Sequence, residues 1–145
     1  MKVLTIGTDR KLFEEGSAVG SRIVEYGNIF EELKVIVFNV RDDKNRLKVT
    51  KLSDNIFIHP TNSSSRMFYI VDAIRIGKNI IRTSCLRAND SVISTQDPFE
   101  TGLVGLLLKL RYKLPLQIQL HTDFASRYFI THSILNLIRF PLGLF

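Results

Sequence analysis

Four short polar segments of this chain carry side chains that could bind or transform a hydroxyl-rich ligand. Each follows a short apolar run of the kind that forms a buried strand. The segments are Gly7-Thr8-Asp9, Pro60-Thr61-Asn62, Thr95-Gln96-Asp97 and His121-Thr122-Asp123. The carboxyl ends of parallel strands share one edge of a sheet, so these hydroxyl, carboxylate, amide and imidazole groups are expected to meet there. The same residue types also dominate ordinary loops, because they cap helices and stabilise turns.

His121 is the best catalytic candidate in this set. An imidazole at a strand end can donate to a substrate hydroxyl, and its ordinary pKa lies close to neutral pH. Asp123 follows two residues later and could orient the imidazole or act itself. A structural hydrogen-bond donor is the alternative role of a lone histidine. No spacing of His, Cys, Asp and Glu is typical of a metal site, and no Gly-x-Ser-x-Gly nucleophile turn occurs, so we predict no metal.

An anion site is predicted where Gly16 and Ser17 open the first helix. The free backbone amides and the positive end of the helix dipole at such a point suit a diphosphate. Arg22 lies one turn further on and could supplement this site, or it could simply face solvent. The Gly-x-Gly-x-x-Gly dinucleotide pattern and the P-loop pattern are both absent, which disfavours a nicotinamide cofactor and ATP hydrolysis.

The segment from Ser91 to Gly102 reads as a buried strand that leads into a capped helix. Asp97 occupies the expected N-cap position, Pro98 the first helical position, and Glu100 the position that closes a capping box. Capping alone accounts for Asp97, and a role in ligand binding is the other interpretation. A strand followed by a helix is the repeating unit of a parallel α/β sheet.

The rest of the chain repeats this alternation of strands and helices. Further strands are expected at 3–7, 33–38, 56–58 and 116–120, with helices over 19–32 and beyond 65, and an amphipathic segment over 126–139. The segment 39–54 fits a solvated turn with an edge strand, and equally a plain charged loop. On the helix beyond 65, the expected apolar stripe is Met67, Ile70, Val71, Ile74 and Ile81, preceded by possible serine caps at 63–65. The pattern predicts a Rossmann-like parallel sheet with helices on both faces.

Size and composition indicate one globular domain over residues 1–145, with 45% hydrophobic and 23% charged residues. The formal net charge of +6 suits an anionic partner such as a nucleotide phosphate, a lipid headgroup or a nucleic acid, and equally a plain solvated surface. No nucleic-acid-binding motif is found, so a nucleic acid is not expected. The single cysteine, Cys85, favours a reducing compartment.

The sequence contains no signal peptide and no apolar run of about 18 residues, so a cytoplasmic protein is expected. The apolar segment from Tyr128 to Phe145 could lie on a membrane surface, at its inner face, or form a core helix.

Several segments, taken in order, resemble the N-terminal domain of family 4 glycosyltransferases. They are M-K-V-L-T-I-G-T-D, E-E-G-S-A-V, R-I-V-E-Y-G, S-T-Q-D-P-F-E-T-G-L and Q-L-H-T-D-F, and together they span essentially the whole chain. The fourth and fifth are the specific parts. The resemblance implies the two-domain GT-B architecture and retaining transfer of a sugar from a nucleotide-sugar donor, as in carbohydrate biosynthesis. The nucleotide sugar would be a substrate, and no cofactor is implied.

The resemblance also implies roles for individual residues. His121 would lie near the reacting sugar, Gly16 and Ser17 would approach the donor diphosphate, and the acceptor cleft would be lined at Asp97 and Asp123, with Thr95 beside Asp97. The acceptor would be a glycan or a lipid-linked hydroxyl. The family's second domain, which holds most of the donor nucleotide and the paired glutamates, has no counterpart in the chain, so the chain alone is expected to be inactive without a separate C-terminal domain.

Two other function classes remain open from the sequence. One is a non-catalytic Rossmann-like binding module that acts with a partner chain or a membrane surface. The other is a nucleotide-binding regulator of the flavodoxin-like type, which is disfavoured because no specific phosphate-binding loop is present.

Overall fold

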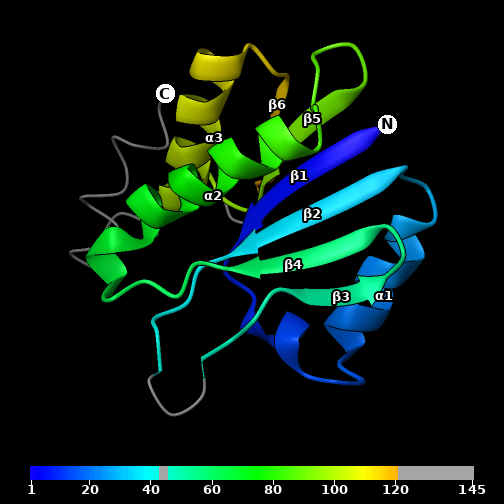
Figure 1. The fold of residues 1–145 in the computed structure, drawn as a ribbon, viewed down its shortest axis with the longest axis vertical. Helices are drawn as coiled ribbons and strands as arrows, with labels where there is room; N and C mark the ends of the chain where they lie inside the picture. The colour runs from blue at the N-terminus through cyan, green and yellow to red at the C-terminus, as the bar shows by residue number, and fades with distance from the viewer. Residues whose placement is uncertain (43–45, 121–145) are drawn as a thin grey trace.

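A six-stranded sheet forms the centre of the protein, with the strand order β3-β4-β2-β1-β5-β6 (Figure 1). The computed structural model describes residues 1–42 and 46–120. Its strands are β1 (Lys2–Gly7), β2 (Glu32–Val37), β3 (Thr50–Ser53), β4 (Ile56–Pro60), β5 (Ser91–Thr95) and β6 (Leu116–Ile118). All neighbouring pairs are parallel except β3 and β4, which are antiparallel. The predicted α/β, Rossmann-like fold is confirmed.

Helices cover both faces of this sheet and divide the core into two layers. They are α1 (Ala18–Gly27), α2 (Tyr69–Thr83) and α3 (Glu100–Tyr112), with short 3-10 helices η1 (Arg10–Phe13) and η2 (Arg66–Phe68). Leu4 and Ile6 of β1 pack with α2 and α3, whereas Val3 packs on the other face with α1. This division follows from the strand geometry, because successive side chains point to opposite faces.

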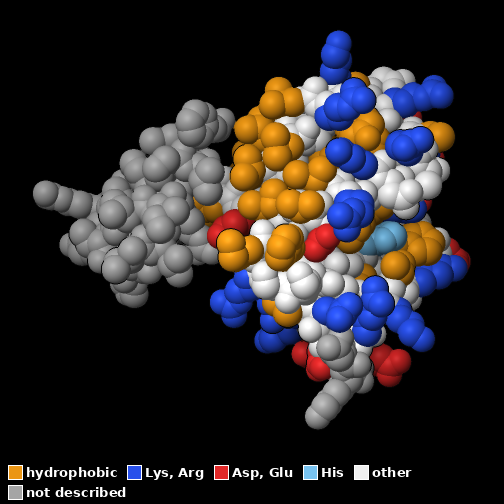
Figure 2. Space-filling view, turned by 60° about the vertical axis from the view of Figure 1, so that its left-hand side comes forward, with side chains coloured by type: hydrophobic (Ala, Val, Ile, Leu, Met, Phe, Trp, Pro, Cys, Tyr) orange, Lys and Arg blue, Asp and Glu red, His pale blue; other side chains and the backbone are white. Residues whose placement is uncertain are grey.

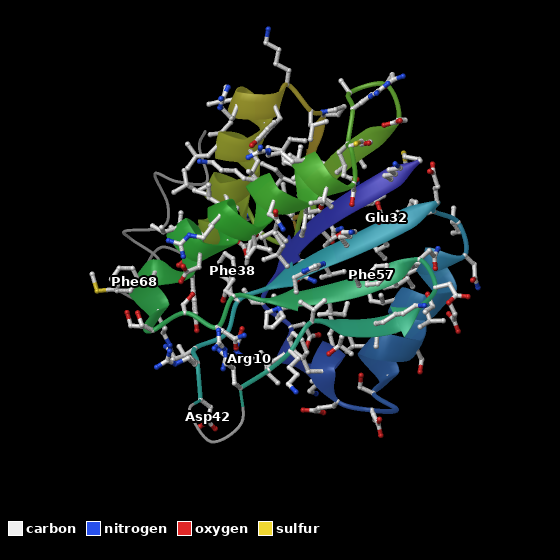
Figure 3. The ribbon with its side chains drawn as sticks, viewed as in Figure 1. Arg10, Glu32, Phe38, Asp42, Phe57 and Phe68 are labelled. Atoms are coloured by element: carbon white, nitrogen blue, oxygen red, sulfur yellow. The ribbon has the colours of Figure 1, made fainter. Side chains whose placement is uncertain are left out.

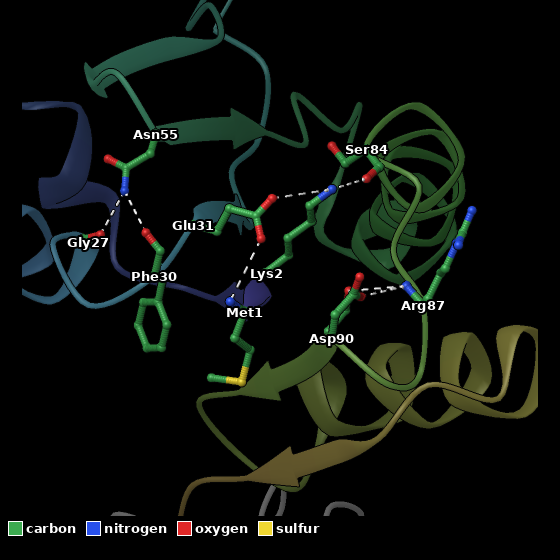
Figure 4. Close-up of polar contacts among 10 residues, drawn as sticks. Met1, Lys2, Gly27, Phe30, Glu31, Asn55, Ser84, Arg87 and Asp90 are labelled. Atoms are coloured by element: carbon green, nitrogen blue, oxygen red, sulfur yellow. Dashed lines mark hydrogen bonds and ion pairs between the residues drawn. The ribbon is translucent and has the colours of Figure 1, made fainter.

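Helix α1 begins where the sequence predicts but ends earlier. The Ser17 hydroxyl accepts a hydrogen bond from the Gly20 amide at 3.1 Å, as expected of an N-cap. The helix ends at Gly27, five residues before the predicted end, because Glu32 already belongs to β2. The Asn55 side-chain amide donates to the carbonyls of Gly27 at 2.7 Å and Phe30 at 2.9 Å, which satisfies this helix end (Figure 4).

The predicted apolar stripe of α2 is only partly correct. Ile70, Ile74 and Ile81 pack against the core, but Met67 and Val71 are exposed to solvent. Of the expected serine caps, Ser65 occupies the N-cap position of η2 but makes no side-chain capping bond, and Phe68 is the residue at the N-cap of α2. The buried residues of α2 are Ala73, Gly77, Ile80 and Ile81, and at Gly77 a Cβ would lie 2.6 Å from Leu108 of α3.

The segment between β2 and β4 contains the edge strand that the sequence left as one of two alternatives. Strand β3 pairs antiparallel with β4 and forms the edge of the sheet. Beyond the carboxyl ends of β2 and β4, the Thr61 hydroxyl accepts from the Asn39 amide and donates to the Asn39 carbonyl, both at 3.0 Å. The Asn62 side chain accepts from Asn39 and donates to the Leu47 carbonyl. These bonds fix the loops at this edge.

The opposite, amino-terminal edge of the sheet is held by contacts of the first two residues (Figure 4). The Lys2 ammonium donates to the Ser84 carbonyl at 3.0 Å, and the Met1 amino group lies 3.8 Å from the Glu31 carboxylate.

None of the described helices is long and apolar enough to cross a membrane.

Candidate functional site

The carboxyl ends of β1 and β5 are joined directly. Strand β1 pairs in parallel with β5, so Gly7 and Gln96 emerge at the same edge. The Gln96 side-chain carbonyl accepts a hydrogen bond from the Thr8 amide at 3.1 Å. A Cβ at position 7 would lie 2.3 Å from that oxygen, so a side chain there would displace Gln96 from its hydrogen bond with Thr8. Two of the four polar strand ends are thus brought together as the sequence predicts.

A groove of about 450 Å³ begins at this junction and runs along the α1 face of the sheet. Its volume lies in the range of small-molecule sites. The polar lining comprises Thr5, Asp9, Arg22, Ser94, Gln96, Gln117 and Gln119, and the apolar lining includes Val19, Ile23, Tyr26, Phe30, Leu33 and Val92. The groove therefore offers several hydrogen-bonding groups, one positive and one negative charge, and an apolar wall.

The aromatic side chains lie on the wall formed by α1 and the segment that follows it. Tyr26 is 54% exposed, whereas Phe30 is partly buried and packs against the hydrophobic core on the α1 side of the sheet. A planar aromatic ring beside hydrogen-bonding groups suits a ligand with both an apolar face and polar edges.

Two glutamines of the groove were missed as site residues. Gln117 and Gln119 lie in the alternating segment Leu116 to Leu120, and the pleat of a strand places alternate side chains on one face. The structure places both in the groove, whereas Leu116 and Ile118 face α3. Gln119 also donates to the Ser94 hydroxyl at 3.1 Å. The alternation was the signal that could have identified them.

The three predicted phosphate-binding residues lie on α1 and the turn before it, but they do not all line the groove. Arg22 lines it together with Asp9. Ser17 caps the helix through its hydroxyl, and Gly16 has a φ of 72°, a left-handed conformation that favours glycine. Gly16 and Ser17 are not among the lining residues, so Arg22 is the member of this set that faces the groove.

The two predicted acceptor-binding residues flank Gln96, and their side chains make local contacts. Thr95 is fully buried, and its hydroxyl donates to the Asp97 carbonyl at 3.3 Å. The Asp97 carboxylate accepts from the Phe99 amide at 2.8 Å and from the Thr101 hydroxyl at 2.8 Å. Asp97 thus stabilises the start of α3 from the turn before the helix, whereas Phe99 occupies the N-cap position where Asp97 was predicted. Because α3 begins at Glu100, the predicted capping box does not form.

The predicted catalytic residues His121 and Asp123 lie outside the described residues. Among the described residues, His59 is the one histidine, and burial lowers its pKa to about 4, with a smaller contribution from Lys34 that Glu32 opposes. Its Nε2 atom is buried and has no hydrogen-bond partner within the described part of the chain. It lies on β4, away from the groove.

No group of His, Cys, Asp and Glu suited to a metal ion is found in residues 1–42 and 46–120.

Arg10 connects the loop after β1 to α2 at the carboxyl edge of the sheet. Its guanidinium donates to the Phe38 carbonyl at 3.3 Å and to the Tyr69 hydroxyl at 3.1 Å. Figure 3 shows Arg10 and Phe38 at this edge, with Glu32 and Phe57 towards the opposite end of the sheet. The Phe38 and Tyr69 rings pack at a centroid distance of 5.2 Å. Arg10 could not be singled out from the sequence, because a lone arginine after a strand carries no distinctive signal.

We compared the sequence with protein-family models and with curated proteins, and neither comparison finds a match. The site is therefore characterised by its chemistry: a groove on the α1 face of the sheet that reaches the carboxyl ends of β1 and β5, lined by amides, hydroxyls, one arginine and one aspartate. This arrangement can hold a polar ligand that carries an anionic group.

Proposed function

We propose that this chain is the acceptor-side domain of a family 4 glycosyltransferase, which transfers a sugar with retention from a nucleotide sugar to a hydroxyl acceptor. The proposal rests on the resemblance of the sequence segments and on one structural observation. That observation is the groove beside the first helix that Asp9, Arg22 and Gln96 all line. Ligands bind at this edge in open parallel sheets.

The chemistry of the groove suits such a transfer. The reaction forms a bond between the acceptor oxygen and the anomeric carbon and breaks the bond from that carbon to the diphosphate. Negative charge develops on the leaving diphosphate, and an oxygen of that diphosphate takes the proton that the acceptor hydroxyl loses. A guanidinium stabilises such charge through paired hydrogen bonds, and Arg22 is the cation that lines the groove. The amides and hydroxyls of Gln96, Gln117 and Ser94 suit sugar hydroxyls.

By the resemblance alone, we assign His121 and Asp123 as the side chains nearest the reacting sugar. The donor nucleotide would be held mainly by the C-terminal domain of such an enzyme. The acceptor would be a glycan or a lipid-linked hydroxyl, and the reaction would take place in the cytoplasm, with the protein peripheral to the inner face of the membrane.

The test is a transfer assay with a panel of nucleotide sugars and glycan or lipid-linked acceptors. The chain is mixed with the donor-binding domain of a family 4 glycosyltransferase, and sugar transfer is measured for the wild type, Arg22→Met and His121→Ala. We expect Arg22→Met to lower the rate by about tenfold to a hundredfold, because it removes a charge-stabilising group. His121→Ala is expected to lose transfer.

Arg87→Met is the matched control, because Arg87 is exposed in the turn before β5 and does not line the groove. Ligand titration of the chain alone accompanies the assay. Saturable binding of a nucleotide sugar or acceptor that Arg22→Met does not weaken would contradict the assignment of Arg22. Binding of a glycan without transfer to it by any mixture would favour the non-catalytic binding module instead.

A further inference from the structure

Helix α2 and the short helix η2 before it present a stripe of exposed side chains that the groove does not use. The stripe consists of Met67 and Phe68 of η2 and of Val71, Arg75, Lys78 and Arg82 of α2, and from Phe68 onwards its members are three or four residues apart. Met67 is 88% exposed, Phe68 51% and Val71 52%. We call this set the α2 stripe. It is apolar at the start of the helix and basic towards its end.

The basic half of the stripe carries nearly uncompensated positive charge. Arg75 pairs with Asp72 at 3.0 Å, whereas Lys78 and Arg82 form no ion pair within the described part of the chain. The neighbouring helix α3 packs against α2 and adds exposed Lys109 and Arg111, together with exposed Leu107 and Leu110. Figure 2 shows hydrophobic side chains gathered over one area of this face, with lysine and arginine side chains beside them.

We propose that the α2 stripe docks on an anionic lipid bilayer. An amphipathic surface of this kind binds when its apolar side chains enter the boundary between headgroups and acyl chains and its cations contact anionic headgroups. The charge is complementary to the cytoplasmic leaflet, whose surface is negative. This surface differs from the C-terminal segment that the sequence suggested as a membrane contact.

The apolar half of the stripe favours a bilayer over a nucleic acid. A phosphodiester backbone offers partners for Arg75, Lys78 and Arg82 but not for the side chains of Met67 and Phe68. Both side chains are exposed, and the contact of their apolar surface with water is unfavourable. A lipid surface satisfies both halves of the stripe at once.

Docking through the stripe would bring the carboxyl edge of the sheet close to the membrane. Met67 and Phe68 lie before the first residue of α2, at the same edge as Arg10, which bonds Tyr69 at 3.1 Å (Figure 3). If the proposed function holds, this orientation favours a lipid-linked acceptor over a free glycan. The docking itself does not depend on that function.

The test is flotation of the full chain with vesicles of phosphatidylcholine alone or with added phosphatidylglycerol. We expect binding to the anionic vesicles that weakens as salt is raised, and little binding to the neutral vesicles. Lys78→Glu/Arg82→Glu and Met67→Ser/Phe68→Ser/Val71→Ser should each lower the bound fraction by about tenfold or more in partition coefficient. All substituted positions are exposed, so circular dichroism should show an unchanged fold.

Two variants away from the stripe serve as matched controls. Lys11→Glu/Lys48→Glu makes the same change in net charge, and Ile29→Ser/Val49→Ser removes exposed apolar side chains elsewhere. Both should bind like the wild type. The proposal is overturned if anionic vesicles do not bind at low salt, if the stripe variants bind normally, or if the controls lose binding equally. It is also overturned if an RNA oligonucleotide competes fully with vesicles and the serine variant binds vesicles normally.

Discussion

Lowering the pH is expected to destabilise this fold through His59. Burial and, to a smaller extent, the nearby Lys34 ammonium lower the pKa of this imidazole from 6.5 to about 4. The unfolded chain keeps the ordinary pKa, so it binds a proton at a higher pH than the folded chain does. The stabilising contribution of neutral His59 is therefore fully present above the unfolded pKa of 6.5 and is lost as the pH falls towards 4.

The size of the effect follows from the shift. Moving the pKa from 6.5 to about 4 corresponds to an upper limit of about 3.4 kcal/mol, at about 1.36 kcal/mol per unit. The side chain is only half-buried, so solvent screens part of this energy. We expect a loss of about 1–2 kcal/mol between about pH 7.5 and about pH 4.5 that is specific to His59.

The assay is urea unfolding at the two pH values for the wild type and His59→Leu. Carboxyl groups titrate in both proteins, so the difference between their pH dependences isolates the imidazole. If His59→Leu loses as much stability on acidification as the wild type, the reasoning about this buried imidazole is refuted.

Three further predictions concern backbone positions and caps, all measured by urea unfolding. Gly16→Ala should destabilise by about 1–2 kcal/mol because of the left-handed φ of 72°, and no loss would show that the turn relaxes freely. Gly105→Ala should destabilise by about 1–3 kcal/mol despite the better helix propensity of alanine, because its Cβ would lie 2.6 Å from Thr95; a gain would contradict this packing. Asp97→Ala should cost about 1 kcal/mol, and Asp97→Asn less, because an amide oxygen can still accept from the Phe99 amide. If both Asp97 variants lose the same unfolding free energy, the stabilisation comes from the carboxylate charge and not from the hydrogen bond with Phe99, which would contradict this prediction.

Much of the fold could be predicted because its signals are local. Short β-branched runs mark the strands, and Ser17 marks the start of α1. The end of α1 could not be predicted, because it depends on Asn55 and Ile56, which meet Gly27 only in the folded chain. The exposed positions of α2 were also missed, since periodicity shows that a helix has an apolar side but not which apolar residues a neighbouring helix leaves uncovered.

The candidate site was predictable at the level of strand ends and less so at the level of side chains. Parallel topology brings Thr8 and Gln96 together, as expected of two strand ends at one edge. The groove also depends on how α1 lies across the sheet, which brings Arg22 and Tyr26 opposite Gln117. No local sequence pattern specifies that placement. Likewise, the side chains of Thr95 and Asp97 are used by the turn before α3, because the Thr95 hydroxyl donates to the Asp97 carbonyl and the Asp97 carboxylate accepts from the Thr101 hydroxyl.

The most direct test of the central claim is to map ligand contacts by amide chemical shifts. A nucleotide sugar and a glycan or lipid-linked acceptor are titrated separately into the isotope-labelled chain. We predict saturable shifts at the groove, including Thr8, Ser94 and Gln96, that weaken in Arg22→Met. Shifts confined to the amino-terminal edge around Lys2 and Ser84, or no shifts with any ligand of the panel, would contradict a sugar-binding site at the carboxyl ends of these strands.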